Sequence, residues 1–214
     1  MIAAKAITAV ILAYLLGSFP MGVIIGKALF NKDIRKYGSG NTGMANAYRT
    51  FGPAGGIIIL GADILKGAAA AGVGRLLVSW SFPSTSPLET TIVALCGLAA
   101  VIGASYSVFL RFYGGKSVGA STGVIIALYI KILPYLLLLW LLVVLLTRYI
   151  SAAAVVAALA LPVLVALLYP GYPSIVLVAA IGGALVIFRH RENLARIIAG
   201  TERKFALRPR KEEG

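Results

Sequence analysis

The sequence has few residues that can hold a metal ion or form a disulfide. Cysteine and histidine occur once each, as Cys96 and His190, and only seven residues are acidic. One cysteine excludes a disulfide framework and a cysteine-based metal site, and one histidine excludes a histidine-rich metal site. Charged residues make up 13% of the chain and hydrophobic residues 60%. Soluble domains have about 25% charged residues, so this composition excludes an ordinary soluble or disordered protein and indicates a multi-pass membrane protein.

Long apolar runs cover most of the chain. A helix needs about 20 apolar residues to cross a bilayer core. The run from 118 to 147 is too long for one crossing, and we divide it at Lys131 and Pro134 because proline ends a helix or lies in its first turn. We therefore predict an all-α integral membrane protein with one domain over residues 1–214 and seven transmembrane helices, at residues 6–26, 54–77, 88–110, 118–130, 132–147, 151–168 and 174–188.

The basic residues predict how these helices are oriented. With seven crossings, 16 of the 20 Lys and Arg residues lie on the side of the C-terminus, the exceptions being Lys5, Lys66, Arg75 and Lys131. Basic residues concentrate in cytoplasmic loops, so we predict an N-terminus outside and a cytoplasmic C-terminus; six crossings would abolish the bias. The net charge of +13 then reflects topology and attraction to anionic lipid, not nucleic-acid binding. A signal peptide is the alternative for residues 6–26, but this run exceeds the usual apolar stretch of about 7–15 residues.

Gly38, Gly40 and Gly43 lie in a polar segment after the first predicted helix. Glycine adopts positive φ at little cost, so backbone N–H groups there can converge on a phosphate. The glycines match G-x-G-x-x-G, but no strand precedes them, and we discount a dinucleotide site. A flexible polar loop is the alternative. The segment also carries side chains that can contact a phosphate, namely Ser39, Asn41, Asn46 and Arg49.

A second glycine pair precedes the helix predicted at 118–130. Gly114 and Gly115 are followed by Lys116 and Ser117, like the end of a P-loop, but Leu110 stands where a P-loop needs glycine. What remains is a cation and a hydroxyl at a helix N-terminus, which is a ready anion site. An ordinary turn with a cytoplasmic lysine is the alternative.

Asp63 and Lys66 lie within the helix predicted at 54–77. An ionisable group inside a membrane span costs roughly 2.5–3.5 kcal/mol on insertion scales. The two residues are three positions apart and so share one helix face. An ion pair within the helix and a direct role of Lys66 in substrate binding both remain open.

The last predicted helix ends in Arg189-His190-Arg191-Glu192-Asn193. We expect Arg189 and Arg191 to be solvated basic residues at the membrane surface. His190 and Asn193 are three positions apart and can turn one face toward the other loops. The polar segments together predict a phosphate-binding cavity open to the cytoplasm, without a carboxylate cluster for a metal.

These motifs together resemble a known family. Five occur in order: Gly-Ser-Gly-Asn at 38–41, Asp-Ile-Leu-Lys-Gly at 63–67, Gly-Gly-Lys at 114–116, Arg-Tyr-Ile-Ser at 148–151 and Arg-His-Arg-Glu-Asn at 189–193. In this order, on a seven-span scaffold, they resemble the acyl-phosphate-dependent glycerol-3-phosphate acyltransferases, the PlsY family.

The resemblance implies a monomeric enzyme of the bacterial inner membrane with its active site facing the cytoplasm. It implies transfer of a fatty acyl group from acyl phosphate to the 1-hydroxyl of glycerol 3-phosphate, giving lysophosphatidic acid and phosphate, with no metal or cofactor. The implied partners are these two substrates and membrane lipid. By resemblance the catalytic positions are Ser39, Arg49, Lys116, His190 and Asn193. Further positions are expected to bind substrate: Gly38, Gly40, Asn41, Gly43, Asn46, Lys66, Gly114, Gly115, Ser117 and Ser151.

The chain has no obvious general base for this reaction. His190 is the only histidine, and the residue five positions later is Ala195, so the H-x-x-x-x-D pattern of unrelated acyltransferases is missing. The resemblance implies that substrate phosphate takes the hydroxyl proton, with His190 mainly a phosphate ligand. The chain also departs from the family pattern at several positions: Ala45, Ala104, Ser107, Ser117 and Ala154.

Two other functions compete with acyl transfer. Short broken helices near Lys131 and Pro134 and the Asp63–Lys66 pair would suit a transporter for a phosphorylated metabolite. Against it, the polar motifs collect at one predicted membrane face and not at the midplane. A metal-dependent lipid phosphotransferase lacks the carboxylates that it would need.

Overall fold

The computed structural model describes residues 2–79 and 86–205, and these residues form helices and no strand. Seven longer helices are α1 (Ile2–Ser18), α3 (Met44–Ser79), α4 (Pro87–Ser105), α5 (Val118–Leu128), α6 (Leu133–Thr147), α7 (Ile150–Leu168) and α8 (Pro173–Arg189). The shorter elements are α2 (Met21–Phe30), η1 (Ile34–Lys36), η2 (Val108–Leu110), η3 (Ile130–Ile132) and α9 (Arg191–Ile198). Three of the helices begin with proline in the first turn, where its missing N–H costs nothing: α4, α6 and α8.

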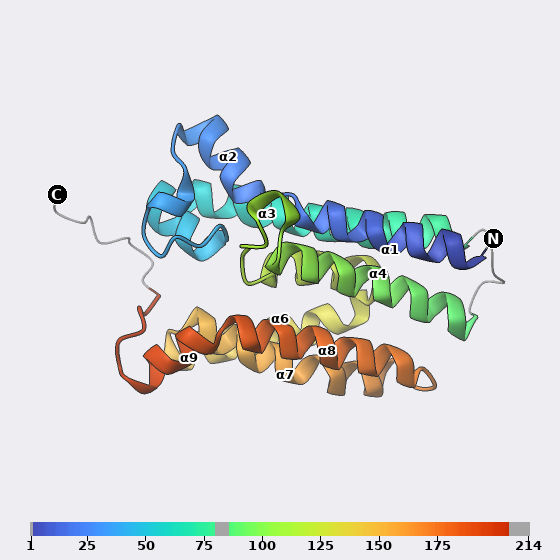
Figure 1. Cartoon of the computed structure of the whole chain (residues 1–214). Coiled ribbons are helices and arrows are strands. Elements are labelled where there is room, and N and C mark those ends of the chain that lie inside the picture. Colours follow the sequence, from blue (N-terminus) through green and yellow to red (C-terminus); the bar gives the residue numbers. More distant parts are fainter. Residues whose placement is uncertain (1, 80–85, 206–214) are drawn as a thin grey trace.

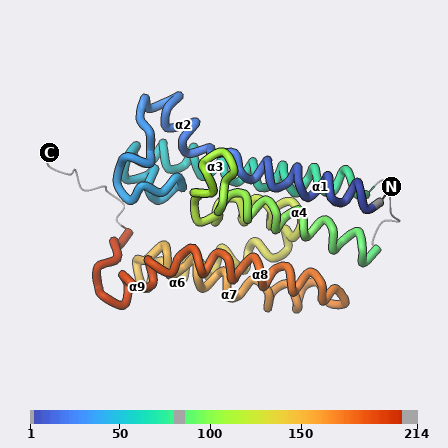
Figure 2. Tube along the Cα trace, viewed as in Figure 1, coloured from blue at the N-terminus to red at the C-terminus, as the bar shows by residue number. Residues whose placement is uncertain are grey.

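The longer helices lie side by side along one axis (Figure 1). α1, α4, α6 and α8 run toward one end of the bundle, and α3, α5 and α7 run away from it. That end, which we call the polar end, carries residues 19–43, 106–117 and 189–205. The opposite end is formed where α3, α5 and α7 finish and α4 and α8 begin. The chain trace in Figure 2 shows that the polar end is assembled from segments far apart in sequence.

Two apolar clusters hold the bundle together. One joins α1, α3 and α4 through small buried residues such as Ala9, Ala70 and Ala100, and the other joins α6, α7 and α8 around Ile132, Val165 and Ile175. Small residues let membrane helices approach closely. Glycine is needed at Gly67, where an added Cβ would lie 2.1 Å from the Ala120 carbonyl oxygen of α5. Leucines on the outer surface, among them Leu138, Leu145 and Leu146, are largely exposed and suit contact with lipid.

The structure confirms a multi-pass helical protein but not the count of seven crossings. Five segments are long and apolar enough to cross a membrane, and the pair of α8 and α9, bent by 53°, is a sixth candidate. The helix predicted at 118–130 ends at Leu128 and has only 11 residues, or about 16 Å of length. The predicted break near Lys131 is confirmed, because η3 separates α5 from α6.

Two predicted helices have different boundaries because the backbone bends. The run predicted at 6–26 is divided between α1 and α2 at Phe19 and Pro20, since proline disrupts the helical hydrogen bonding before it. The helix predicted at 54–77 begins earlier, at Met44, and has a non-helical residue at Gly52 (φ 78°, ψ −174°) just before Pro53. The turns before Gly52 therefore lie at the polar end instead of continuing straight into the span.

Candidate active site

The first glycine segment is held in shape by Asn46. Its Nδ2 donates hydrogen bonds to the carbonyl oxygens of Ile34 (3.2 Å), Tyr37 (3.0 Å) and Asn41 (2.9 Å), and its Oδ1 accepts from the Ser39 N–H (2.9 Å). Asn46 is 1% exposed. Because its donors and acceptor are all used inside the loop, we assign Asn46 to positioning the loop and not to direct contact with substrate.

Glycine is required at Gly38 and Gly40 by the backbone. Both have positive φ, 58° and 70°, and a Cβ at Gly38 would lie 2.2 Å from Asn46 Oδ1. Downstream, Asn41 Oδ1 accepts from the Gly43 N–H at 2.9 Å, which closes the turn before α3. Ser39 is left on the exposed side of this turn.

The second glycine pair packs against the first segment. A Cβ at Gly115 would lie 3.4 Å from Thr42 Oγ1 and 3.8 Å from Asn41 Oδ1. The Gly115 N–H donates to the Ala104 carbonyl at 3.0 Å, which ties the turn to the end of α4. The predicted meeting of the two glycine segments is therefore present in the fold.

Arg189 fixes the Gly114–Gly115 turn and corrects an expectation. Its Nη2 donates to the Gly114 carbonyl at 2.8 Å and its Nε to the Gly115 carbonyl at 3.1 Å, and its guanidinium lies 5.1 Å from the centre of the Tyr106 ring. The expectation that Arg189 is solvated is therefore wrong. α8 ends next to this turn, and the carbonyl groups of Gly114 and Gly115 accept the hydrogen bonds of the guanidinium. Arg191 is exposed, as predicted.

Lys116 and Asn193 belong to a polar network that α5, α7 and α9 share. Lys116 Nζ donates to Asn193 Oδ1, and Asn193 Nδ2 donates to Glu202 Oε1 at 2.6 Å. Ser151 Oγ donates to the same Glu202 oxygen at 2.8 Å, while Arg196 Nε donates to Glu202 Oε2 at 2.8 Å. Three residues predicted from separate motifs thus meet around one carboxylate.

Sequence reasoning missed Glu202. Its side chain is only 8% exposed, and it organises the network from a segment that looks like a basic tail. The available signal was the scarcity of acidic residues: a glutamate between Arg196 and Arg203 is unusual in a chain with seven acids. Nothing in its local spacing points to Ser151, which is 51 residues away.

Burial and neighbouring charges set the protonation of this network. Burial lowers the pKa of Lys116 to about 8, although Glu202 opposes this shift; Arg49 is another of the charges that act on Lys116. Burial alone would raise the pKa of Glu202, but hydrogen bonds from Asn193, Arg196 and Ser151 outweigh it and hold that pKa below its ordinary value. The site therefore combines an ionised carboxylate with a lysine that titrates near neutral pH.

His190 lies directly after α8, outside the span, and is 4% exposed. Burial lowers the pKa of its ring to about 4, so the imidazole is neutral at physiological pH. Its Nδ1 lies 2.8 Å from the Val186 carbonyl oxygen. A carbonyl can only accept, so Nδ1 carries the proton and Nε2 keeps a lone pair.

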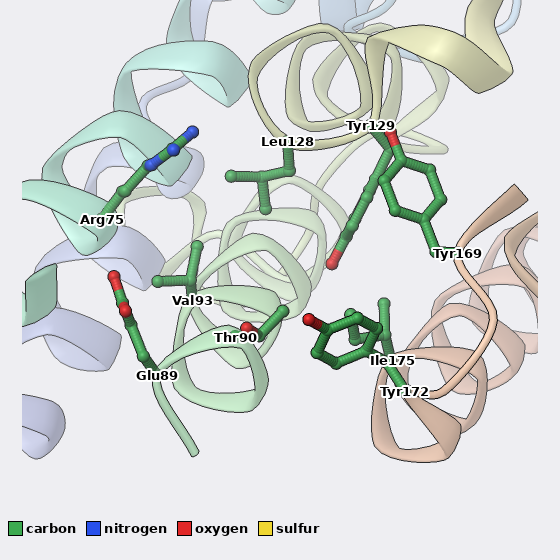
Figure 3. A pocket seen from close by; sticks show the side chains of 9 residues that line it. All are labelled: Arg75, Glu89, Thr90, Val93, Leu128, Tyr129, Tyr169, Tyr172 and Ile175. Atoms are coloured by element: carbon green, nitrogen blue, oxygen red, sulfur yellow. The ribbon is translucent and has the colours of Figure 1, made fainter. Parts of the chain in front are cut away.

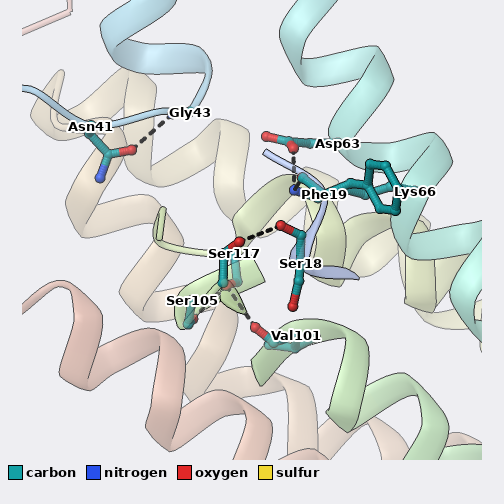
Figure 4. A network of polar contacts seen from close by, with 10 residues as sticks. Ser18, Phe19, Asn41, Gly43, Asp63, Lys66, Val101, Ser105 and Ser117 are labelled. Carbon is teal, nitrogen blue, oxygen red and sulfur yellow. Dashed lines mark hydrogen bonds and ion pairs between the residues drawn. The ribbon is translucent and has the colours of Figure 1, made fainter. Parts of the chain in front are cut away.

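Two predicted binding residues are engaged inside the protein (Figure 4). Ser117 Oγ donates to the Val101 carbonyl at 2.9 Å and lies 2.5 Å from Ser105 Oγ. Lys66 Nζ lies 2.7 Å from Asp63 Oδ1 and donates to the Phe19 carbonyl at 3.0 Å, at the break between α1 and α2. The ion-pair alternative for Lys66 thus has direct geometric support, and among residues 2–79 and 86–205 no hydrogen bond or ion pair joins Lys66 to the Lys116 network. Within the described residues, no cluster of three potential metal ligands occurs.

Comparisons with known proteins agree with the site. Residues 7–200 match the family model described as glycerol-3-phosphate acyltransferase. Glycerol-3-phosphate acyltransferase 2 of Moorella thermoacetica is 39% identical over 94% of this chain and 97% of its own. Glycerol-3-phosphate acyltransferase of Staphylococcus carnosus is 40% identical over 91% of this chain and 95% of its own.

Two solved structures share the fold. The crystal structure of PlsY, an integral membrane glycerol 3-phosphate acyltransferase, in its glycerol 3-phosphate form superposes with a TM-score of 0.82 at 37% identity, covering 94% of this chain and 96% of that one. Its lysophosphatidic acid form gives a TM-score of 0.80 at 35% identity, covering 94% and 95%. The match over nearly the full length of both chains shows that this protein belongs to the glycerol-3-phosphate acyltransferase family.

Proposed function

We propose that the chain transfers a fatty acyl group from acyl phosphate to the 1-hydroxyl of glycerol 3-phosphate. The acyl carbon forms a bond to the glycerol oxygen, and its bond to the phosphate oxygen breaks. The hydroxyl proton passes to a substrate phosphate, and the products are lysophosphatidic acid and inorganic phosphate. The observation that carries the proposal is the network joining Lys116, Asn193, Ser151 and Glu202 beside the two glycine segments. The related PlsY structures are named as glycerol 3-phosphate and lysophosphatidic acid forms, which correspond to the acceptor and the product of this reaction.

The cations of the polar end are suited to two phosphates. Lys116 and Arg49 act on each other electrostatically, and a guanidinium can bind a phosphate through two parallel hydrogen bonds. Ser39 adds a hydroxyl on the exposed side of its turn. One donor directed at a developing oxyanion contributes roughly 3–4 kcal/mol. Holding donor and acceptor together contributes further through proximity.

His190 is better suited to the glycerol hydroxyl than to a phosphate. A neutral ring whose Nδ1–H faces Val186 presents only an acceptor at Nε2, and an acceptor does not bind an unprotonated phosphate oxygen. It can accept a hydrogen bond from the attacking hydroxyl and orient it. With a pKa of about 4 the ring is a weak proton acceptor, which supports transfer of the proton to substrate phosphate. This revises the sequence-based expectation that His190 is mainly a phosphate ligand.

The seven-crossing topology remains part of the proposal. The alternating helix directions place the two ends of the described chain at opposite ends of the bundle (Figure 1), as an odd number of crossings requires. The short α5, together with η3, would form a pass with fewer residues than the others. Basic residues such as Lys27, Lys32 and Arg196 lie at the polar end, so the positive-inside rule favours a cytoplasmic active site in the inner membrane. We also propose one domain over residues 1–214 that acts as a monomer without metal or cofactor.

To test the proposal, detergent-purified protein is incubated with palmitoyl phosphate and glycerol 3-phosphate, and the release of phosphate is measured. Phosphate release that needs both compounds, with palmitoyl-lysophosphatidic acid identified by mass spectrometry, would support the proposal. Replacing Lys116 by Ala should remove most of this activity. Lys131→Ala is the matched control, because Lys131 is exposed and lies in η3, outside the network. Equal activity with palmitoyl coenzyme A as the only donor would refute the choice of donor, and full activity of Lys116→Ala would refute the site.

A further inference from the structure

A cavity of about 310 Å³ lies at the opposite end of the bundle, away from the candidate active site. Its polar walls come from five helix ends: Arg75 of α3, Glu89 and Thr90 of α4, Tyr129 after α5, Tyr169 after α7 and Tyr172 before α8. Ligand pockets have volumes of about 300–1,000 Å³. This cavity is therefore large enough for a small polar group, and nothing in the proposed acyl transfer uses it.

Glu89 gives the cavity an unusual feature. The residue is 9% exposed, and within the described part of the chain its Oε2 is buried without a hydrogen-bond partner. A buried polar atom without a partner costs about 1–3 kcal/mol, and more when it is charged. The pattern Ser86-x-x-Glu89 suggests a capping box, but Ser86 makes no side-chain capping hydrogen bond. Capping therefore does not account for this carboxylate.

The other polar groups lie across from each other in the cavity (Figure 3). Arg75 and Glu89 are on one side, and no ion pair joins them among the described residues, whose ion pairs all involve other partners. The tyrosines are on the other side, with the hydroxyls of Tyr129 and Tyr172 directed toward the middle. Tyr129 and Tyr169 are held edge to face, with ring centres 5.4 Å apart. A carboxylate and tyrosine hydroxyl groups that face one cavity can accept hydrogen bonds from an ammonium group.

We propose that this cavity binds the zwitterionic headgroup of an ammonium-bearing phospholipid in the leaflet opposite the active site. The ammonium would pair with Glu89 and lie against the tyrosines, and the phosphate would contact Arg75, which is exposed at the rim. A lipid is the favoured source because residues at the ends of α3, α4 and α7, which are long and apolar enough to cross a membrane, line the cavity. Arg75 and Glu89 form no ion pair within the described residues, and their opposite charges on one wall match the two charges of such a headgroup.

The test uses full-length protein in detergent, and native mass spectrometry measures the binding of didecanoyl phosphatidylethanolamine and didecanoyl phosphatidylglycerol. Phosphatidylethanolamine should bind more tightly to the unmodified protein. Glu89→Gln should weaken that binding by at least about tenfold, because a charge-assisted hydrogen bond is lost, and should leave phosphatidylglycerol binding unchanged. Arg75→Gln should weaken both lipids. Glu192→Gln is the matched control, since that glutamate is exposed in α9 at the polar end.

The variants distinguish folding from binding. Glu89→Gln removes a carboxylate that has no partner, so its thermal midpoint without lipid should be no lower than that of the unmodified protein. Equal affinity for the two lipids, or Glu89→Gln binding phosphatidylethanolamine normally, would overturn the proposal. Soluble O-phosphoethanolamine is the third ligand in the series. Glu89-dependent binding of that compound without any binding of the lipid would assign the cavity to a soluble ligand and also overturn the proposal.

Discussion

At the polar end, the Glu202 carboxylate accepts hydrogen bonds from Ser151, Asn193 and Arg196. At the opposite end, Glu89 Oε2 is buried with no partner among the described residues. Both side chains are largely shielded, so water does not explain the difference. A carboxylate with partners organises a site before substrate arrives, whereas a buried oxygen without a protein partner can still accept a hydrogen bond from a ligand. The two ends therefore illustrate a carboxylate that the fold satisfies and one that it does not, on one helical scaffold.

The largest expected effect comes from removing the charge that organises the polar end. Glu202→Gln leaves Arg196 without its ion-pair partner and removes the charge that favours protonated Lys116. Asn193 and Ser151 also lose a charged acceptor, and a hydrogen bond to a charged group contributes about 1.5–3 kcal/mol, so we expect kcat/KM for glycerol 3-phosphate to fall about 100-fold or more in the phosphate-release assay.

The control for that variant is Glu192→Gln. Glu192 also acts on Lys116 but is exposed, with a side chain 75% exposed, and charges in water interact weakly. Its kcat/KM should stay within about twofold of the unmodified enzyme. Equal losses in the two variants would mean that net charge, and not the Glu202 network, explains the effect.

His190→Gln should have the next largest effect. Loss of a group that orients the attacking hydroxyl is expected to lower kcat by about 10- to 100-fold, less than the loss of a general base, which reaches about 10⁴-fold. The Kd for glycerol 3-phosphate, measured by calorimetry, should change little, because the ring faces the hydroxyl and not the phosphate. A variant that binds normally but has no detectable turnover would identify His190 as the base and refute proton transfer to substrate.

Affinity for glycerol 3-phosphate should depend on pH through Lys116. Below its pKa of about 8 the ammonium is charged and attracts phosphate, and above it the neutral amine does not. Affinity should therefore fall as pH rises above about 8, by up to about tenfold per pH unit. Calorimetry between pH 7 and pH 10 measures this decline. Lys116→Arg should flatten the profile, because guanidinium stays protonated, and an unchanged profile in that variant would contradict the assignment.

The smallest expected effect is on stability and compares the two carboxylates directly. Glu202→Gln should lower the free energy of unfolding by about 1–3 kcal/mol, because charged hydrogen bonds are lost. Glu89→Gln should leave it unchanged or raise it, since no partner is lost. Thermal unfolding in detergent measures both variants. A larger loss for Glu89→Gln than for Glu202→Gln would reverse the contrast between the two ends.

Three helices and the break near Lys131 could be predicted closely from the sequence, and the bends at Pro20 and Gly52 could not. Apolar run lengths and proline positions placed α6, α7 and α8 within one residue of their observed limits. We did not predict the bend at Gly52. It results from the positive φ of one residue, and the residues on both sides of Gly52 are helical. We did not predict α9 because it has only eight residues and is mostly polar.

Lys116 and Asn193 were both expected from the family resemblance, and the structure brings them into contact. The contacts of Arg189 with Gly115 and of Glu202 with Ser151 were not expected, because nothing in the residues around Arg189 or Glu202 indicates these partners. The direct binding expected of Asn46 and Ser117 is not supported by their contacts: sequence shows that an amide or a hydroxyl is present, but only the fold shows that it is already used inside the protein.

The central claim is that Lys116 at the polar end binds the phosphate of glycerol 3-phosphate. Calorimetric titration of glycerol 3-phosphate at pH 7 into the unmodified protein, Lys116→Ala and Lys131→Ala tests it most directly. We predict that Lys116→Ala weakens binding by at least about tenfold, because a charge-assisted hydrogen bond is lost, while Lys131→Ala binds like the unmodified protein. Unchanged affinity in Lys116→Ala, or an equal loss in both variants, would contradict the claim.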